Sequence, residues 1–105
     1  MLYYTFVSVN IIVFFDDKGR QYNLSDIEKS LRQHLYQEEF IYPEYVTLVC
    51  ENSKIELHCN QFLVTGAYFF RVREKVVHLV GELYKTSVIL HKPSLWDRLT
   101  RKFRN

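Results

Sequence analysis

Residues 67–85 read AYFFRVREKVVHLVGELYK, and the fold depends on whether they form a helix or a hairpin. Their valines favour strands, and a hairpin that turns at Glu74 and Lys75 is one possible arrangement. On a helical wheel, however, the apolar residues fall within one half and the charged residues fall opposite, with Arg73 as the exception. The pattern therefore predicts a helix over 67–85. Its apolar half holds Phe69, Phe70, Val72, Val76, Val77, Leu79, Val80, Leu83 and Tyr84.

The segments on either side of this helix have strand patterns. Residues 45–50 and 55–60 are apolar or alternating and are separated by a polar loop at 51–54, which is typical of a hairpin. A short apolar run at 88–91 predicts one more strand. The second strand of the hairpin places Ile55, Leu57 and Cys59 on one face and Glu56, His58 and Asn60 on the other.

The amino-terminal part begins with an apolar run at 2–15. Because this run is apolar on both faces, it predicts one central strand, which a turn at 16–19 ends. Ser25 and Glu28 match a capping box, so a helix is predicted over 25–38. The apolar stripe of that helix consists of Ile27, Leu31 and Leu35.

Together these elements follow the order β-α-β-β-α-β. This order predicts an α+β fold of the ferredoxin-like type, in which an antiparallel sheet carries two helices on one face. A basic C-terminal helix is added to it. We therefore expect a single α+β domain at 1–91 and a basic amphipathic segment at 92–105. The ferredoxin-like fold hosts many functions and specifies none of them.

The segment 92–105 carries the net charge of the chain. It holds five basic side chains and one acid, a charge of +4, whereas residues 1–91 hold nine basic and eleven acidic side chains. Ser94 and Asp97 match a second capping box directly after Pro93, so a helix is predicted to start there. The apolar stripe of this helix is Leu95, Trp96, Leu99 and Phe103.

This basic helix is the predicted partner-binding segment. Charge asymmetry of this kind is typical of a segment that contacts a partner, and Trp and Arg are enriched at binding hot spots. In the alternative interpretation, the stripe packs on the domain and the basic residues serve only solubility. The predicted contact residues are Trp96, Arg98, Leu99, Arg101, Lys102, Phe103 and Arg104.

Two short patterns resemble nucleases. Asp16 and Asp17 follow the first strand, as in small ferredoxin-like nucleases of the Cas2 type, where an acid at that position serves the metal. His58 lies on a strand and Tyr68 at the start of a helix, which resembles the HUH nucleases, although Asn60 replaces their second histidine. The resemblances imply a metal-dependent nuclease. The alternatives are an acidic turn and a surface histidine.

Apart from these patterns the sequence contains no catalytic or metal-ligand spacing, so neither a cofactor nor a metal is expected. The function predicted is that of a small non-enzymatic binding protein, such as an inhibitor, adaptor or immunity-type factor, that acts by protein–protein contact through an aromatic-rich surface and the basic helix. A nucleic-acid-binding regulator is the first alternative, because ferredoxin-like sheets can stack bases on exposed rings.

Location and assembly are predicted from the apolar run and the cysteines. A run of about fifteen residues is too short for a membrane-spanning helix of about 20, so a cytoplasmic protein without a transmembrane segment is expected. Cys50 and Cys59 flank the central hairpin, where a cross-strand bond is conceivable, but free thiols are favoured. A four-stranded sheet leaves one face and an edge uncovered, so a homodimer is a further expectation.

Overall fold

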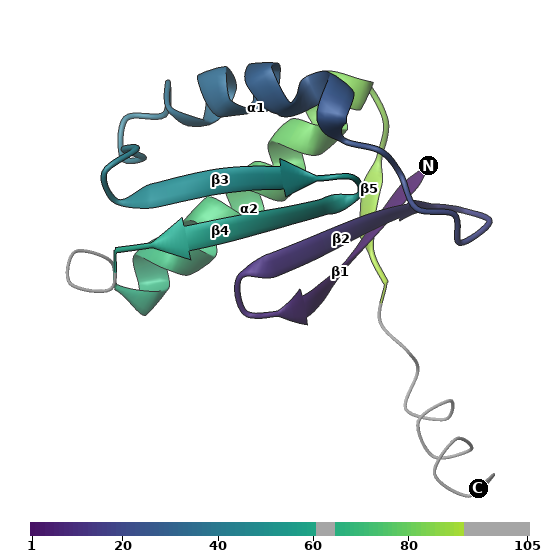
Figure 1. Cartoon of the computed structure of the whole chain (residues 1–105), viewed down its shortest axis with the longest axis horizontal. Helices are drawn as coiled ribbons and strands as arrows, with labels where there is room; N and C mark the ends of the chain where they lie inside the picture. The colour runs from purple at the N-terminus through teal and green to yellow at the C-terminus, as the bar shows by residue number, and fades with distance from the viewer. Residues whose placement is uncertain (61–64, 92–105) are drawn as a thin grey trace, which may run out of the picture.

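The computed structural model of the protein describes residues 1–60 and 65–91, and these form a five-stranded sheet with two α-helices (Figure 1). The strands are β1 (Leu2–Ser8), β2 (Ile11–Asp16), β3 (Val46–Glu51), β4 (Lys54–Cys59) and β5 (Val88–Leu90). The two α-helices are α1 (Glu28–Leu35) and α2 (Gly66–Tyr84). A short 3-10 turn, η1 (Ser25–Ile27), directly precedes α1.

Helix α2 confirms the prediction for 67–85. Its start is capped by Thr65, whose hydroxyl oxygen accepts a hydrogen bond of 3.2 Å from the Tyr68 N–H. It ends at Lys85, which adopts the left-handed conformation with φ of 54°. The buried apolar residues of the helix are Phe69, Val72, Val76, Val77, Leu79 and Val80. Of the predicted apolar half only Phe70 is exposed, at 55%.

The apolar run at 2–15 is a hairpin, so the single strand predicted there is wrong. Strands β1 and β2 pair antiparallel around a turn at Val9 and Asn10. The Ser8 hydroxyl donates to Asn10 Oδ1 at 2.9 Å beside this turn. The run contains no glycine or proline, so Ser8 and Asn10 were its only turn-favouring residues, and the prediction read them as interruptions of one strand.

The sheet has the strand order β3-β4-β2-β1-β5. Strand β5 is parallel to β1, and every other neighbouring pair is antiparallel. The elements from β2 onward follow the predicted β-α-β-β-α-β order, but β1 lies between β2 and β5. The fold is therefore α+β, with a mixed five-stranded sheet in place of the antiparallel sheet that was predicted.

Helix α1 begins later and ends earlier than predicted. The predicted Ser25 cap is wrong, because the turn before the helix is built by Asn23, whose Oδ1 accepts from the Ser25 N–H at 2.9 Å. An asparagine that bonds to the main chain two residues ahead forms an Asx turn, which takes the place of a capping box. Helix α1 ends at Leu35, three residues before the predicted boundary at 38.

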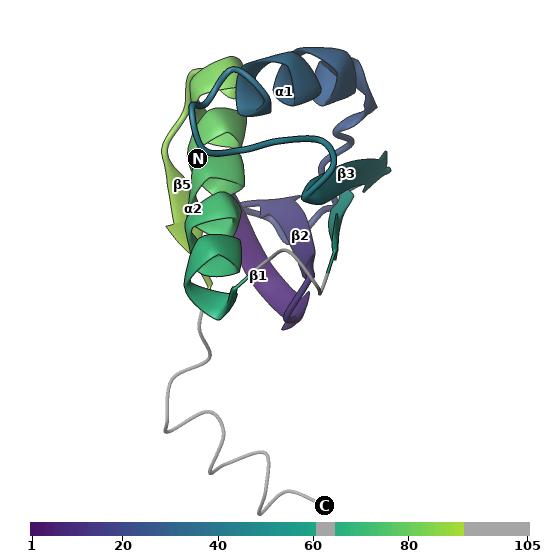
Figure 2. The same cartoon turned by 90° about the vertical axis from the view of Figure 1, so that its left-hand side faces the viewer.

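The core lies between the sheet and the helices. Figure 2 shows α1 and α2 on the same side of the sheet, and Figure 1 shows α2 crossing the sheet while α1 runs beside β3. Both helices and every strand except β5 contribute fully buried side chains, among them Leu2, Phe14, Leu31, Leu48, Ile55 and Val76. The predicted basic helix in 92–105 lies outside the described residues.

Neither of the two α-helices in residues 1–60 and 65–91 has the length and apolar character that crossing a membrane requires.

Candidate functional site

One face of the sheet carries no helix and forms the candidate site. Side chains alternate along each strand, so Leu2, Ile12 and Phe14 point into the core, and their neighbours Tyr3 and Phe15 point to the other side. The helices cover only the face that carries Leu2, Ile12 and Phe14 (Figure 2). We call the second the open face.

Four residues of the open face form an apolar cluster over β2, β1 and the end of β5. Tyr3 and Phe15 are directly opposite across β1 and β2, and their ring centroids are 5.9 Å apart with planes inclined by 18°. Ile89 is paired with Tyr3 on the other side. The His91 ring meets Phe15 edge-on at 5.5 Å. The cluster Tyr3, Phe15, Ile89 and His91 is therefore contiguous across three strands.

The half of the open face over β3 and β4 is charged. Lys54 is within 3.7 Å of Glu51, and Glu56 is within 3.5 Å of the His58 ring. These pairs are solvent-exposed, so each contributes little to stability. The open face thus has an apolar half beside the carboxyl end of β5 and a polar half away from it.

Arg73, the exception on the helical wheel, lies in an aromatic cage on the opposite side of the sheet. Its side chain is 9% exposed, and its Nε has no hydrogen-bond partner. Its guanidinium carbon lies 3.7 Å from the Phe6 ring centroid and 4.9 Å from that of Phe70. Burial lowers the pKa of this guanidinium. Cation–π contacts thus take the place of a carboxylate partner.

The residues that resemble nuclease motifs have structural roles of their own. Asp16 Oδ1 accepts hydrogen bonds from the N–H groups of Lys18 and Arg20, at 2.9 and 2.8 Å, and its Oδ2 accepts from Arg20 Nε. These bonds, the Arg20 main-chain bond foremost, lower the Asp16 pKa. The Tyr68 ring packs against Phe40 and Tyr45, and burial raises its pKa.

No group of three or more His, Cys, Asp or Glu side chains suited to holding a metal occurs within residues 1–60 and 65–91. Cys50 and Cys59 are free thiols, as favoured by the sequence.

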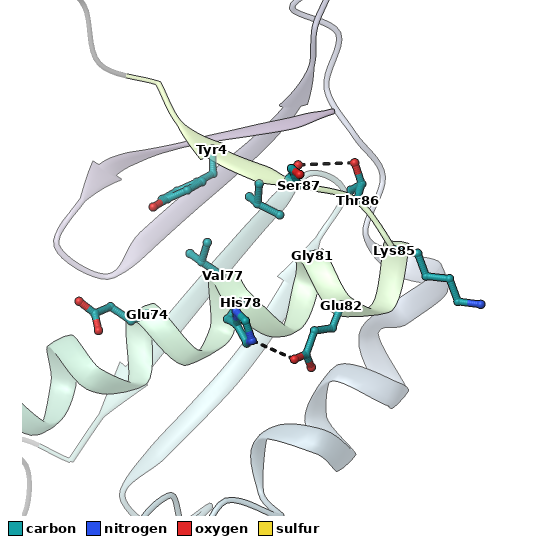
Figure 3. Close-up of a pocket in the computed structure, with 10 residues that line it drawn as sticks. Tyr4, Glu74, Val77, His78, Gly81, Glu82, Lys85, Thr86 and Ser87 are labelled. Carbon is teal, nitrogen blue, oxygen red and sulfur yellow. Dashed lines mark hydrogen bonds and ion pairs between the residues drawn. The ribbon is translucent and has the colours of Figure 1, made fainter.

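A groove of about 760 Å³ runs between α2 and the start of β5 (Figure 3). Its helix side carries Glu74, His78 and Glu82, and His78 Nε2 is 2.8 Å from a Glu82 carboxylate oxygen. Its strand side is formed by Tyr4 and the residues that lead into β5, which are Thr86, Ser87 and Val88.

The predicted contact residues Trp96, Arg98, Leu99, Arg101, Lys102, Phe103 and Arg104 all lie outside the described residues. Sequence reasoning did not single out Tyr3 and Phe15. Because side chains alternate in direction along a strand, the strands 2–8 and 11–16 would have placed both rings on one face, had the turn between them been recognised.

Comparison of the chain with models of protein families, with curated proteins and with solved structures finds no match.

Proposed function

We propose that this protein is a non-enzymatic binding module, of the inhibitor, adaptor or immunity type, that contacts a protein partner through the apolar cluster of the open face and the basic segment 92–105. The observation that carries the proposal is the position of His91. It belongs to the cluster through its contact with Phe15, and it is the residue directly before the basic segment.

The composition of the cluster supports a protein partner. Aromatic and aliphatic side chains in contact with one another, bordered by polar residues, are typical of the centre and the rim of a protein interface. The basic segment, which follows His91 in the sequence, holds five positive side chains. A partner with an apolar patch next to an acidic one complements both features.

Site-specific photo-crosslinking in the native host tests the proposal. A benzophenone side chain at Tyr3 is expected to form an adduct with one protein, and the adduct should be lost when Arg98, Arg101 and Lys102 are changed to Glu. Tyr42 is the matched control, because it is an exposed tyrosine that lies in the connection before β3. Equal adducts from both positions, or no adduct from Tyr3, would contradict the proposal.

A nucleic-acid partner is the second candidate, and one observation favours it. The Tyr3 and Phe15 rings lie on neighbouring strands with nearly parallel planes, an arrangement on which bases stack in RNA-recognition modules. The polar half of the open face, however, holds Glu51 and Glu56 beside Lys54, which does not attract phosphate. Anisotropy of a labelled single-stranded oligonucleotide separates the two candidates, since nucleic-acid binding weakens steeply with salt.

A further inference from the structure

Arg73 is more deeply buried than Arg32 of α1, yet it does not use its hydrogen-bond donors. Arg32 donates to the Leu48 carbonyl oxygen through Nε and Nη2, at 3.2 and 2.9 Å. Its Nη2 also lies 2.7 Å from a Glu28 carboxylate oxygen. An arginine has five N–H donors, and those of Arg73 have no hydrogen-bond or ion-pair partner within residues 1–60 and 65–91. The donors of Arg73 are therefore available to a ligand.

The aromatic contacts of Arg73 leave the edge of its guanidinium open. With its carbon 3.7 Å from the Phe6 ring centroid, the guanidinium lies over the face of that ring. The N–H donors lie in the guanidinium plane, so they point past the ring. Nε is the only one of the three nitrogens that is both enclosed and without a partner. The two terminal nitrogens therefore reach the surface.

The positive charge of Arg73 is not compensated by the elements around it. Residues 1–15, which include Phe6, contain no charged side chain, and residues 66–73 at the start of α2 contain two arginines and no acid. The next acid, Glu74, lines the groove beside β5 (Figure 3). The helix dipole adds positive potential at this end of α2. The surroundings of Arg73 therefore favour an anion.

Exposed apolar side chains adjoin this charge. Phe70, whose ring centroid is 4.9 Å from the guanidinium carbon, is 55% exposed. Val9, in the turn between β1 and β2, is 65% exposed. Phe69 connects the two, because its ring centroid is 6.5 Å from that of Phe70 and it lines a pocket of about 460 Å³ together with Val9. We call Phe6, Val9, Phe70 and Arg73 the arginine patch.

We propose that the arginine patch binds an acidic side chain of a protein segment, an aspartate or glutamate with an apolar neighbour. The carboxylate accepts two parallel hydrogen bonds from the terminal nitrogens of Arg73, a geometry that the planar guanidinium matches. The apolar neighbour packs on Phe70. Because the rings already hold the guanidinium in place, little side-chain freedom is lost on binding.

Two properties of the patch support a carboxylate on a protein as its ligand. Arginine and aromatic side chains in contact are the residue types most enriched at protein-binding hot spots. A nucleic-acid backbone is held by several cations along its length, whereas the patch presents a single guanidinium. The other arginine of this helix end, Arg71, lies over the Phe40 ring at 4.1 Å and is not part of the patch.

Nitrogen-15 NMR of the arginine Nε–H groups in the full chain tests the proposal. The probe is the peptide acetyl-Phe-Glu-amide, and acetyl-Phe-Gln-amide is its counterpart without the carboxylate. The Arg73 signal is expected to shift and saturate with the Glu peptide, and the Gln peptide should bind at least about tenfold more weakly. Arg71 is the matched control, since it is an exposed arginine over a ring of the same structure, and its signal should not saturate.

Three variants assign the binding to the patch. Arg73→Met is expected to remove the preference for the Glu peptide, whereas Arg71→Met should keep it. Phe70→Ala should weaken binding of the Glu peptide about fivefold or more, because the apolar neighbour loses its contact. Circular dichroism checks that the variants are folded, and the peptide pair on the unchanged protein is a test that needs no variant.

Three results would overturn the proposal. The first is equal affinity of the unchanged protein for the Glu and Gln peptides. The second is no saturable shift of the Arg73 signal at peptide concentrations up to about 10 mM, which lies above the Kd expected for one charged contact. The third is tighter binding of benzyl phosphate than of the Glu peptide, which would assign the patch to a phosphorylated ligand.

The proposal goes beyond binding by the open face, because the arginine patch lies on the helix side of the sheet. The two experiments fail separately. The peptide titration uses the purified chain and reports Arg73, whereas the photo-adduct at Tyr3 reports the partner of the open face. Arg73→Met is therefore expected to leave the Tyr3 adduct unchanged, and its loss in that variant would overturn the separation of the two sites.

Discussion

The guanidinium carbon of Arg73 lies 3.7 Å above the centre of the Phe6 ring. This contact joins α2 to β1 and holds a positive charge in a site that is nine-tenths buried. The charge is offset by the faces of aromatic rings, and ring faces compensate a desolvated cation less completely than a carboxylate does.

Replacing Arg73 by Met is therefore expected to leave the free energy of unfolding unchanged or to raise it by about 1 kcal/mol. The change removes a buried charge that has no ion-pair partner among residues 1–60 and 65–91, and it keeps the side-chain volume. Phe6→Ala should instead lower it by about 2–4 kcal/mol, through lost burial and the loss of the cation–π contact. Urea denaturation of both variants measures the difference. A loss of several kcal/mol in Arg73→Met would mean that the guanidinium has a partner of opposite charge.

Close packing between α2 and β5 gives a second prediction. A Cβ added at Gly81 would lie 2.7 Å from Val88 Cγ2 and 3.1 Å from the Thr86 carbonyl oxygen. Gly81→Ala is expected to lower the free energy of unfolding by about 1–3 kcal/mol, because the core would be overpacked. Val88→Ala in the same chain should recover part of that loss. Thermal melting tests this, with Gly66→Ala as the neutral control, since a Cβ added there meets no described atom of another element within 4 Å.

The buried face of α2 gives a third prediction. Val76 and Leu79 are 0% and 4% exposed, so Val76→Asp or Leu79→Asp should abolish cooperative unfolding. The reason is that a buried unpaired charge costs several kcal/mol, of the order of the whole stability. Arg71→Asp on the exposed side of the same helix is the control and should keep a normal melt. Variants at 76 and 79 that melt within a few degrees of the parent would contradict the buried helix.

The two thiols are expected to differ in their dependence on pH. Burial, reinforced by Glu28, raises the pKa of Cys50 from 9.0 to about 11. Because the folded pKa is the higher one, the contribution of this thiol to stability is complete below pH 9 and is lost as the pH rises through about 11. Alkylation at pH 8 should modify the exposed Cys59 well before Cys50. Mass spectrometry of the labelled chain checks the order, and a faster reaction at Cys50 would contradict the packing of β3 against α1.

A comparison of the denaturation midpoint at pH 8 and at pH 10.5 completes this test. The midpoint should fall more in the unchanged protein than in Cys50→Val, because the variant has no thiol to ionise at that position. An equal fall in both proteins would assign the loss of stability to other groups.

The sequence predicted the parts of the fold that depend on regular spacing. The apolar half of the helical wheel of 67–85 was sufficient to predict α2 over the alternative hairpin, because the apolar residues keep helical spacing over the whole segment. The strands of the 46–59 hairpin were predicted to within one residue, since a polar loop separates them.

The parts that the sequence did not predict depend on contacts between distant residues. The turn at Val9 and Asn10 lies inside a run that is apolar on both faces, and only Ser8 and Asn10 mark it. The helical wheel identified Arg73 as an exception. The aromatic cage around Arg73, however, forms only when β1 brings Phe6 to α2. The open-face cluster likewise requires the pairing of Tyr3 with Phe15 and Ile89, and that pairing follows from the sheet order.

Side chains of α1 also limit how far the sheet can grow. At the β3 edge Arg32 donates to the Leu48 carbonyl oxygen, and the Tyr36 hydroxyl donates to that of Val46. A sheet that accepts new strands at both ends can add copies without limit and become a fibre. Here one end is occupied by side chains of α1, so growth by strand addition has one direction only. A fibre built by adding strands edge to edge is thereby excluded, because each copy would have to offer both of its edges.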